Sequence, residues 1–521
     1  MGAAHLDGAG RAGLTTVEGN TVLLTATPVA IEDVLAIARG ARVELAPDAI
    51  ERINTARAIV ERALAGPELV YGLNTGLGHL RNERLDTLEL EAYQEAIVRS
   101  HTGGFGPPLP TDVVRAAMAV RVIGIARGGS GASLAVARTL VAMLNAGVHP
   151  VVPTYGSVGA SDLMHMAAIA DVMIGSGSAH IGDRILTGEE ALRQAGIAPL
   201  RLAPKDGLAL VSANGVSIGW ASIVADRAAT LVEAGDVVLA ISLEAINGNL
   251  SIVDPAVAVA KGIPGQTAAA DHLRRLLAES RLGEVDNQSS VQDPLSFRVG
   301  PQVHGAAREF VGLLGQAVET ELNASDDNPL VLADGRLISN GNFHPIVLAL
   351  SLDALRPALA HVGQLSDRRM NHIWERAFGA PDVALPSGLL RMTRHGRGMF
   401  HRYGAATRAA ALRALAAPVT LDIGPLDNGV EDHATNAAEA ARVTADALDA
   451  LADVLTVELL MSRAILIADE TRRGLGVGTR RALEAVDEAL ADIPDDAPSG
   501  QAVAAVKRLL TDGTLAAIGR A

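Results

Sequence analysis

Apolar residues recur at helical spacing along most of this chain. In the stretch 30–66, which includes IEDVLAIARG and ERINTARAIVERALA, they fall at positions i, i+3 and i+4, the spacing of one face of an α-helix. The same period predicts further helices at 84–102, 111–147, 208–247, 301–323, 345–375, 404–418 and 433–466. The pattern therefore favours a mainly α-helical fold with a bundle of long central helices.

Loops rich in Gly, Pro, Asn and Asp separate these helices and hold the unusual residues of the chain. They are YGLNTGLGHL (71–80), PVVPTYGSVGASD (150–162), DNQSSVQDPLSFR (286–298) and NASDDNPLVLADG (323–335). Because Gly and Pro interrupt helices, these segments are expected to be irregular. The sequence GGSGAS (128–133) lies between two helical patterns and is expected to form a tight helix junction.

The length of the chain predicts more than one domain. A chain of 521 residues is too long for one simple core. We predict a flexible Gly-rich leader at 1–20, a loop-bearing N-terminal domain at 21–207, a central long-helix domain at 208–472 and a C-terminal helical cap at 473–521. No internal repeat of fixed period is visible in the sequence.

Composition narrows the class of protein. Hydrophobic residues make up 49% of the chain but aromatic residues only 2%, so Ala, Leu and Val are expected to let the helices pack closely. The net charge of −15, without a basic stripe, argues against nucleic-acid binding. The absence of cysteine excludes disulfides and thiolate chemistry and fits the cytoplasm. We find no signal sequence and no uncharged apolar stretch of about 18 residues, so no membrane span is expected.

The common catalytic signatures are missing from the sequence. The 14 histidines are scattered, and no HExxH pair is present to bind a metal ion. A P-loop and a GxGxxG turn after a strand are also absent, and GGSGAS (128–133) does not form a GxSxG nucleophile elbow. Metal, phosphate, nicotinamide and serine-hydrolase sites are therefore not expected.

Eight loop motifs, taken in order, together resemble the histidine/aromatic amino-acid ammonia-lyase family. Singly, each is an ordinary turn or helix end. The motifs are Tyr71-Gly-Leu-Asn-Thr-Gly, Arg99-Ser-His101 with the nearby GGFGPP, PVVPTYGSVGAS (150–161), Lys205-Asp-Gly-Leu-Ala-Leu leading to Asn214-Gly215, Gln292-Asp-Pro-Leu-Ser-Phe-Arg298, Asp327-Asn-Pro, Gly341-Asn-Phe343-His and Glu431-Asp-His433. The resemblance implies the long-helix architecture that ammonia-lyases share with fumarase and aspartase. It also implies a homotetramer whose active sites take residues from more than one subunit. The serine loop of the fumarase-like lyases, GSSxMPxKxN, is absent.

The resemblance also implies roles for individual residues. The family removes an amine and a β-proton from an aromatic α-amino acid and leaves a trans-arylacrylate. Tyr71 matches the catalytic base, on a Gly-rich loop suited to close over the substrate. Arg298 would bind the substrate carboxylate through its planar guanidinium. Asn214 and Gln292 would orient the substrate or its leaving group, and Phe343 would pack against the aromatic ring.

Two further matches bear on the identity of the ring. In the histidine-specific branch, a histidine and a glutamate at the positions of His101 and Glu431 contact the imidazole. Phenylalanine-type enzymes carry other residues there. Glu431 therefore favours an imidazole-like substrate, although it could instead form a plain ion pair with a nearby arginine.

The sequence departs from the family pattern where the family makes its electrophile. There, Ala-Ser-Gly followed by Asp-Leu cyclises into a methylidene-imidazolone, whereas here Ala160-Ser161 runs directly into Asp162. Cyclisation needs a tight turn in which a side chain at the third residue is an obstruction. In addition, Leu295 replaces a tyrosine that helps to make or use the electrophile. We therefore expect no prosthetic group, and Ser161 would be catalytic only if the ring forms.

These departures point to a substrate whose leaving group needs no electrophile. A quaternary nitrogen departs as neutral trimethylamine, so we predict elimination from a histidine betaine such as ergothioneine, as in the ergothionase-like branch of the family. One alternative is a conventional histidine or aromatic amino-acid ammonia-lyase or aminomutase with the electrophile. Another is a catalytically silent homologue that binds an aromatic metabolite.

Overall fold

The computed structural model describes residues 20–77, 83, 85, 90–284, 289–378, 399–421, 423–468, 474–494 and 497–520. These form two compact units, the first made of Met1–Ile223, Gly315–Leu350 and Val419–Arg442, and the second of Val224–Leu314, Ser351–Pro418 and Val443–Ala521. All but the last residue of the predicted leader lie outside the described residues. The predicted domain limits at 207 and 472 stay predictions.

The expectation of a mainly α-helical fold is confirmed, and the long helices lie where the apolar period predicts them. They are α9 (Gly215–Ile246), α13 (Gly300–Leu322), α14 (Ile346–Phe378), α16 (Arg402–Leu415) and α17 (Ala437–Ala468). The predicted junction at 128–133 is also present, since it separates α4 (Thr111–Ala126) from α5 (Leu134–Ala146). Local sequence period therefore specifies most of this architecture.

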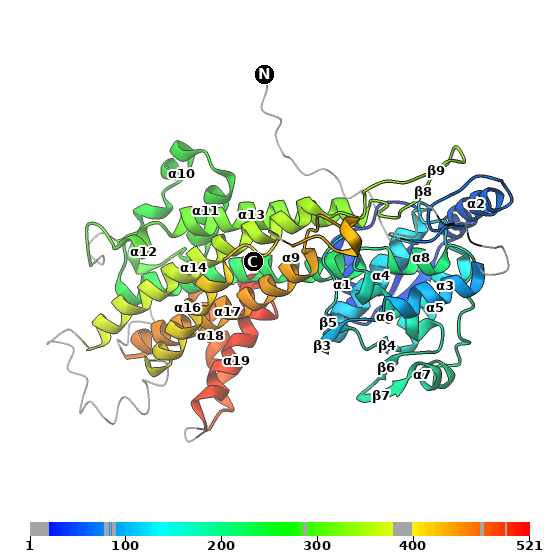
Figure 1. The fold of residues 1–521 in the computed structure, drawn as a ribbon. Helices are drawn as coiled ribbons and strands as arrows, with labels where there is room; N and C mark the ends of the chain where they lie inside the picture. Colours follow the sequence, from blue (N-terminus) through cyan, green and yellow to red (C-terminus); the bar gives the residue numbers. More distant parts are fainter. Residues whose placement is uncertain are drawn as a thin grey trace. The chain divides into compact units, whose positions relative to one another are not determined.

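The first unit joins short helices to several very short strands (Figure 1). Its helices are α1 (Ile31–Ala38), α2 (Pro47–Leu64), α3 (Leu90–Ser100), α4, α5, α6 (Leu163–Met173), α7 (Gly188–Gln194) and α8 (Asp206–Val211). Strand β1 (Thr21–Leu24) pairs in parallel with β2 (Arg42–Leu45), so that Thr21 lies opposite Arg42. The remaining pairs are antiparallel: β3 (Phe105–Pro108) with β5 (Pro153–Tyr155), β6 (Ser178–Ile181) with β4 (His149–Pro150) and β7 (Arg184–Thr187), and β8 (Leu330–Val331) with β9 (Leu337–Ile338).

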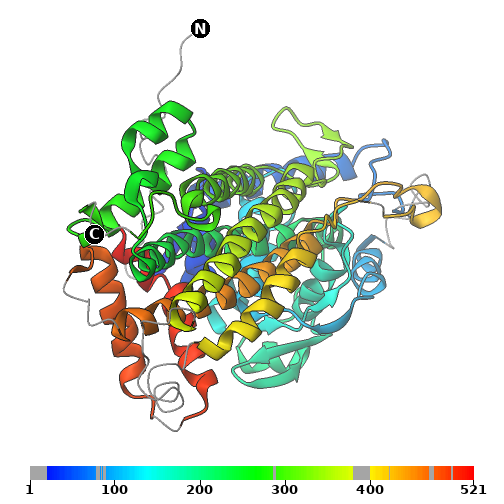
Figure 2. The same cartoon turned by 90° about the vertical axis from the view of Figure 1, so that its left-hand side faces the viewer.

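In the second unit, parts of the long helices α9, α13, α14 and α17 run alongside one another (Figures 1 and 2). A buried apolar cluster joins α14, α16 and α17, and its members are Met370, Ile373, Ala405, Val454, Val457 and Met461. Buried polar contacts also cross the bundle. The fully buried Glu458 of α17 pairs with Arg369 of α14 and accepts a hydrogen bond of 2.6 Å from Ser242 of α9.

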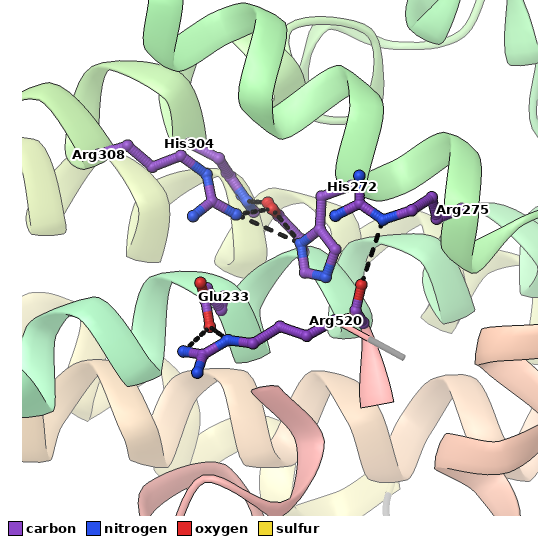
Figure 3. A network of polar contacts seen from close by, with 8 residues as sticks. Glu233, His272, Arg275, His304, Arg308 and Arg520 are labelled. Atoms are coloured by element: carbon purple, nitrogen blue, oxygen red, sulfur yellow. Dashed lines mark hydrogen bonds and ion pairs between the residues drawn. The ribbon is translucent and has the colours of Figure 1, made fainter. Parts of the chain in front are cut away.

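Around this bundle the second unit carries shorter helices: η2 (Leu250–Val253), α10 (Pro255–Lys261), α11 (Pro264–Leu276), η3 (Arg281–Gly283), α12 (Leu295–Arg298), η5 (Met399–His401), α18 (Val477–Ala491), α19 (Ser499–Thr511) and α20 (Thr514–Ile518). Figure 3 shows His304, Arg308 and His272 converging on one point, which is the carboxylate of the buried Asp236. Burial alone would raise the pKa of Asp236. The histidine hydrogen bonds and the Arg308 charge outweigh burial and hold that pKa below its usual value.

Two helical stretches, 206–246 and 346–377, are long and apolar enough to cross a membrane by length and composition alone. Within their most apolar windows, 94% and 56% of the residues are buried inside the protein. Core helices of soluble proteins pass the same test, so this finding is weak evidence for a membrane span.

Candidate active site

The segment 159–162 forms a sharp turn that leads into α6. Gly159 has a φ of +77°, and a Cβ there would lie 2.2 Å from Oγ1 of Thr435, so only glycine fits. Ser161 also has a left-handed φ, +60°. Its N–H donates to the carbonyl of Phe343 at 3.1 Å, and its hydroxyl lies 3.2 Å from that of Ser212. The turn thus brings together residues from four distant segments.

Asp162 anchors this turn. Its side chain is fully buried and accepts hydrogen bonds from the Ser157 hydroxyl (2.8 Å), the Ser217 N–H (2.7 Å) and the Ser217 hydroxyl (2.7 Å). Its own N–H donates to the carbonyl of Ala213 at 2.8 Å. The sequence identified Asp162 only as an obstruction to cyclisation. In the structure it ties the turn to the start of α9.

Asn214 lies in the break between α8 and α9, where the sequence pattern predicts one continuous helix. Its N–H donates to Oδ2 of Asp326 at 2.8 Å instead of to a helical carbonyl. The side chain is buried, yet among the described residues neither its Nδ2 nor its Oδ1 has a hydrogen-bond partner. An unmade buried hydrogen bond costs about 1–3 kcal/mol. The Asn214 amide is therefore well suited to bind a ligand.

The Tyr71 loop is held by hydrogen bonds between the Asn74 side chain and the loop backbone, and by packing against α8. Asn74 closes the turn: its Oδ1 accepts the Val70 N–H at 2.7 Å and its Nδ2 donates to the Glu68 carbonyl at 2.8 Å. Gly72, with φ of +64°, packs so tightly on Leu208 of α8 that a Cβ would lie 2.3 Å from its Cδ2. The loop that carries Tyr71 is therefore docked on the helix that precedes Asn214.

Tyr93 of α3 supports the same loop. Its phenol oxygen accepts the N–H of Leu77 at 3.1 Å. Burial, partly offset by this hydrogen bond, raises the pKa of Tyr93, and the charge of Tyr71 raises it further. Tyr71 is thus close enough to influence the ionisation of Tyr93. The rest of the predicted loop, 78–80, lies outside the described residues.

His101 and Glu431 interact with each other in the first unit. His101 follows α3, and its Nδ1 lies 2.7 Å from the carbonyl of Ile97. A carbonyl only accepts, so Nδ1 carries a proton and Nε2 remains for another partner. Burial, and then Asp427, raise the pKa of Glu431, while His101 lowers it. The two side chains predicted to contact an imidazole ring are thus close enough to interact electrostatically, and their role at the substrate stays a prediction.

Phe343 lies beside His344, which in turn contacts His433, and the sequence singled out neither histidine as a site residue. Its ring meets that of His344 edge-on, with centroids 6.2 Å apart. Nε2 of His344 lies 2.7 Å from Nδ1 of His433, so one ring donates a hydrogen bond to the other. Burial first, and the nearby His433 next, lower the pKa of His344. The motifs Gly341–His344 and Glu431–His433 therefore meet in space.

The remaining two predicted residues belong to the second unit. Gln292 is exposed and its N–H donates to the hydroxyl of Ser290 at 3.2 Å. Arg298 ends α12, and no acidic side chain of the described residues pairs with it. Leu295, in the place of the family tyrosine, has 59% of its surface exposed. The first unit holds Tyr71, His101, Ser161, Asn214, Phe343 and Glu431. A site that unites all eight residues stays a prediction.

Two acidic residues of this region were missed as positioning groups. Asp162 and Asp326 both hold the backbone at the start of α9. The available signal was an acid in each of two motif loops, Asp162 just before α6 and Asp326 just after α13, but the partners of both are distant in sequence. In the described part of the chain, no cluster of three or more His, Asp or Glu side chains is placed to hold a metal ion.

The sequence and the structure both match known proteins. The sequence model of the family described as "Aromatic amino acid lyase" matches residues 29–488. Histidine ammonia-lyase from Gloeobacter violaceus is 35% identical over 502 residues, which cover 95% of this chain and 96% of the relative. Ergothionase from Treponema denticola, an ergothioneine-degrading enzyme solved with desmethyl-ergothioneine sulfonic acid, has a TM-score of 0.86 and 27% identity, covering 95% of this chain and 99% of its own. Histidine ammonia-lyase from Trypanosoma cruzi also has a TM-score of 0.86 and 27% identity. The match covers 96% of this chain and 95% of that enzyme.

Proposed function

The chain belongs to the aromatic amino acid lyase family, a family of carbon–nitrogen lyases, and we propose that it eliminates trimethylamine from an imidazole betaine such as ergothioneine. In this proposal the reaction proceeds without a methylidene-imidazolone electrophile. The observation that carries the proposal is the anchored turn at Ala160–Asp162.

Cyclisation of this turn would require the Asp162 nitrogen to attack the carbonyl carbon of Ala160. That nitrogen donates to Ala213, and the Asp162 carboxylate is fixed by three hydrogen bonds from Ser157 and Ser217. Each hydrogen bond to a charged group contributes about 1.5–3 kcal/mol, so moving Asp162 into a ring is costly. The segment therefore does not fit the electrophile, and we route no step through it.

A quaternary leaving group makes the electrophile unnecessary. In the proposed step the Tyr71 phenolate takes the β-proton, and the electrons of the C–H bond form the Cα–Cβ double bond. The Cα–N bond breaks with its electron pair on nitrogen, which releases neutral trimethylamine and leaves the trans-acrylate. Tyr71 then loses its proton to water, so atoms and charges balance without an oxidant or a co-reactant.

The other predicted residues would hold the substrate. The Arg298 guanidinium would pair with the carboxylate in a bidentate manner, and the unpartnered Asn214 amide would hydrogen-bond to the substrate. Glu431 would accept an imidazole N–H, and Phe343 would pack on the ring. The electrostatic interaction between His101 and Glu431 supports a substrate with an imidazole ring rather than a benzene ring.

Relatives support two specificities. The fold likeness to ergothionase supports the betaine, whereas the 35% identity to a histidine ammonia-lyase favours a second candidate, ammonia elimination from histidine. We extend the proposal to a cytoplasmic homotetramer whose active sites take residues from more than one subunit.

The amine released decides between these candidates. We expect the purified protein to release trimethylamine from hercynine or ergothioneine, with a rise in acrylate absorbance, and no ammonia from L-histidine. Ammonia from histidine would show that the electrophile forms and would refute the proposal. Binding without turnover of any of the three would indicate a silent homologue.

Replacing Ser161 tests whether the protein forms the electrophile. Ser161→Ala removes one neutral hydrogen bond to Ser212, worth about 1 kcal/mol, so kcat with the betaine should fall by less than about tenfold. A conventional enzyme would lose its electrophile and nearly all activity. Measured kcat values of the two proteins, both checked for folding by circular dichroism, settle which case applies.

A further inference from the structure

Asp326, which holds the backbone of Asn214, belongs to a cluster of buried charged side chains in the first unit. The members are Arg57, Arg121, Lys205, Asp206, Glu321, Asp326 and Asp327. Nη2 of Arg121 pairs with Asp327 at 2.7 Å, and its Nη1 lies 3.7 Å from Asp326. Arg57 lies 3.6 Å from Asp206. The cluster therefore contains four acids against three bases.

Lys205 does not remove this imbalance. It is fully buried, and its Nζ has no hydrogen-bond partner among the described residues. Burial, opposed by Asp327, lowers its pKa to about 8, so it is mostly charged at neutral pH. If all acids were ionised, one negative charge would remain without a counter-charge in a poorly solvated site. One acid of the cluster is thus expected to hold a proton.

Glu321 and Asp326 are the acids positioned to share that proton. Both line a cavity of about 10 Å³, which has room for one water molecule. Burial, with Asp326 second, raises the pKa of Glu321 to about 7. Burial, with Asp327 second, raises that of Asp326 to about 6, against the lowering effects of Arg121 and the Asn214 N–H. At neutral pH the proton is therefore mainly on Glu321, and Asp326 is ionised.

We propose that ionised Asp326 is a positioning residue that fixes the Asn214 amide toward the substrate, and that protonation of Asp326 releases this hold. The proposal rests on the lyase function, because it gives Asn214 its role at the substrate. The Asn214 side chain has no partner of its own in the described chain. Its orientation therefore depends on its backbone, which Asp326 holds at the N-terminus of the 32-residue helix α9.

The direction of the pH effect follows from this contact. A carboxylate accepts an N–H about twice as strongly as a neutral acid, and the positive end of α9 favours the charged form. As pH falls through about 6, Asp326 gains a proton, its hold on Asn214 weakens, and kcat/KM falls. The groups facing Asp326 are Glu321 of α13, Arg121 of α4, the neighbouring Asp327 and the Asn214 N–H. Lys205, before α8, interacts with Asp327 and Asp206 instead.

Asp326→Asn tests the hold on Asn214, because it keeps the shape of the side chain and removes its charge. The acid limb of kcat/KM should flatten, since the carboxyl group with a pKa of about 6 is gone. Glu321→Gln should leave the limb in place, because Glu321 already carries its proton when Asp326 titrates. The matched control is Glu319→Gln, an exposed acid two residues earlier on α13, which should leave the limb in place. A purely structural role would change activity equally at every pH, and an acid limb that persists in Asp326→Asn overturns the proposal.

Infrared spectroscopy of the full-length protein gives a readout that needs no turnover. We expect a protonated-carboxyl band at pH 7 in the wild type that is lost in Glu321→Gln. Its absence from the wild type overturns the shared proton even if no substrate is turned over, whereas lack of turnover with the band present refutes only the proposed function. If Asp326→Asn does not fold, imidazole-acrylate binding to the wild type decides: binding should weaken as pH falls through about 6, and binding that does not depend on pH overturns the proposal.

Discussion

Tyr71→Phe should lower kcat by a factor of about 10²–10⁴, the range contributed by a positioned general base. The substitution removes the only atom that can take the β-proton in the proposed step and keeps the ring that packs in the loop. Because Arg298 and Asn214 would still bind the substrate, KM should change much less than kcat. Steady-state kinetics with the betaine, together with deuterium exchange at the β-carbon, measure the two effects separately.

Tyr93→Phe is the matched control for this prediction. Tyr93 is the neighbouring phenol, and it supports the loop through a single hydrogen bond from Leu77. Its removal should cost about 1 kcal/mol and lower kcat by less than about tenfold. Equal losses in the two variants would mean that the phenols only order the loop. A Tyr71→Phe enzyme that retains most of its activity would exclude Tyr71 as the base.

The helices could be predicted from the sequence because each is specified by its own apolar period. The strands could not, because β4, β8 and β9 have two residues each and the rest at most four, too few to show an alternating pattern. The break between α8 and α9 was also missed. Its apolar period continues, but the backbone N–H of Asp162 donates to the Ala213 carbonyl and the Asp326 carboxylate accepts the Asn214 N–H, so these groups are not free for a continuous helix.

The site could be predicted in part for a similar reason. Tyr71, His101, Asn214, Phe343 and Glu431 lie in loop motifs that resemble a known family, so their candidacy needed no coordinates. The roles of Asp162 and Asp326 depend on contacts made 55 and 112 residues away along the chain. No local pattern reveals such contacts. The sequence therefore identifies the residues that would touch the substrate better than those that hold them in place.

The buried pair Arg369–Glu458 allows a stability prediction that does not depend on the substrate. Both side chains are fully buried, and the guanidinium contacts the carboxylate twice, at 2.5 and 2.9 Å. Glu458→Gln keeps the shape but leaves Arg369 charged and without a counter-charge. Breaking a buried pair in this way costs about 3–5 kcal/mol, so the midpoint of urea unfolding should fall markedly.

Two further variants separate the charge effect from packing. Glu439→Gln lies on the same helix, α17, and breaks a partly exposed pair with Arg442; it should cost less than about 1 kcal/mol. The double variant Arg369→Met with Glu458→Met removes both charges at similar volume and should recover most of the stability lost in Glu458→Gln, because a buried pair can often be replaced by apolar side chains without loss. If the double variant is less stable than Glu458→Gln, then the hydrogen bonds from Ser242 to Glu458 and from Arg369 to the Ser296 carbonyl, rather than charge balance, hold α9, α12, α14 and α17 together.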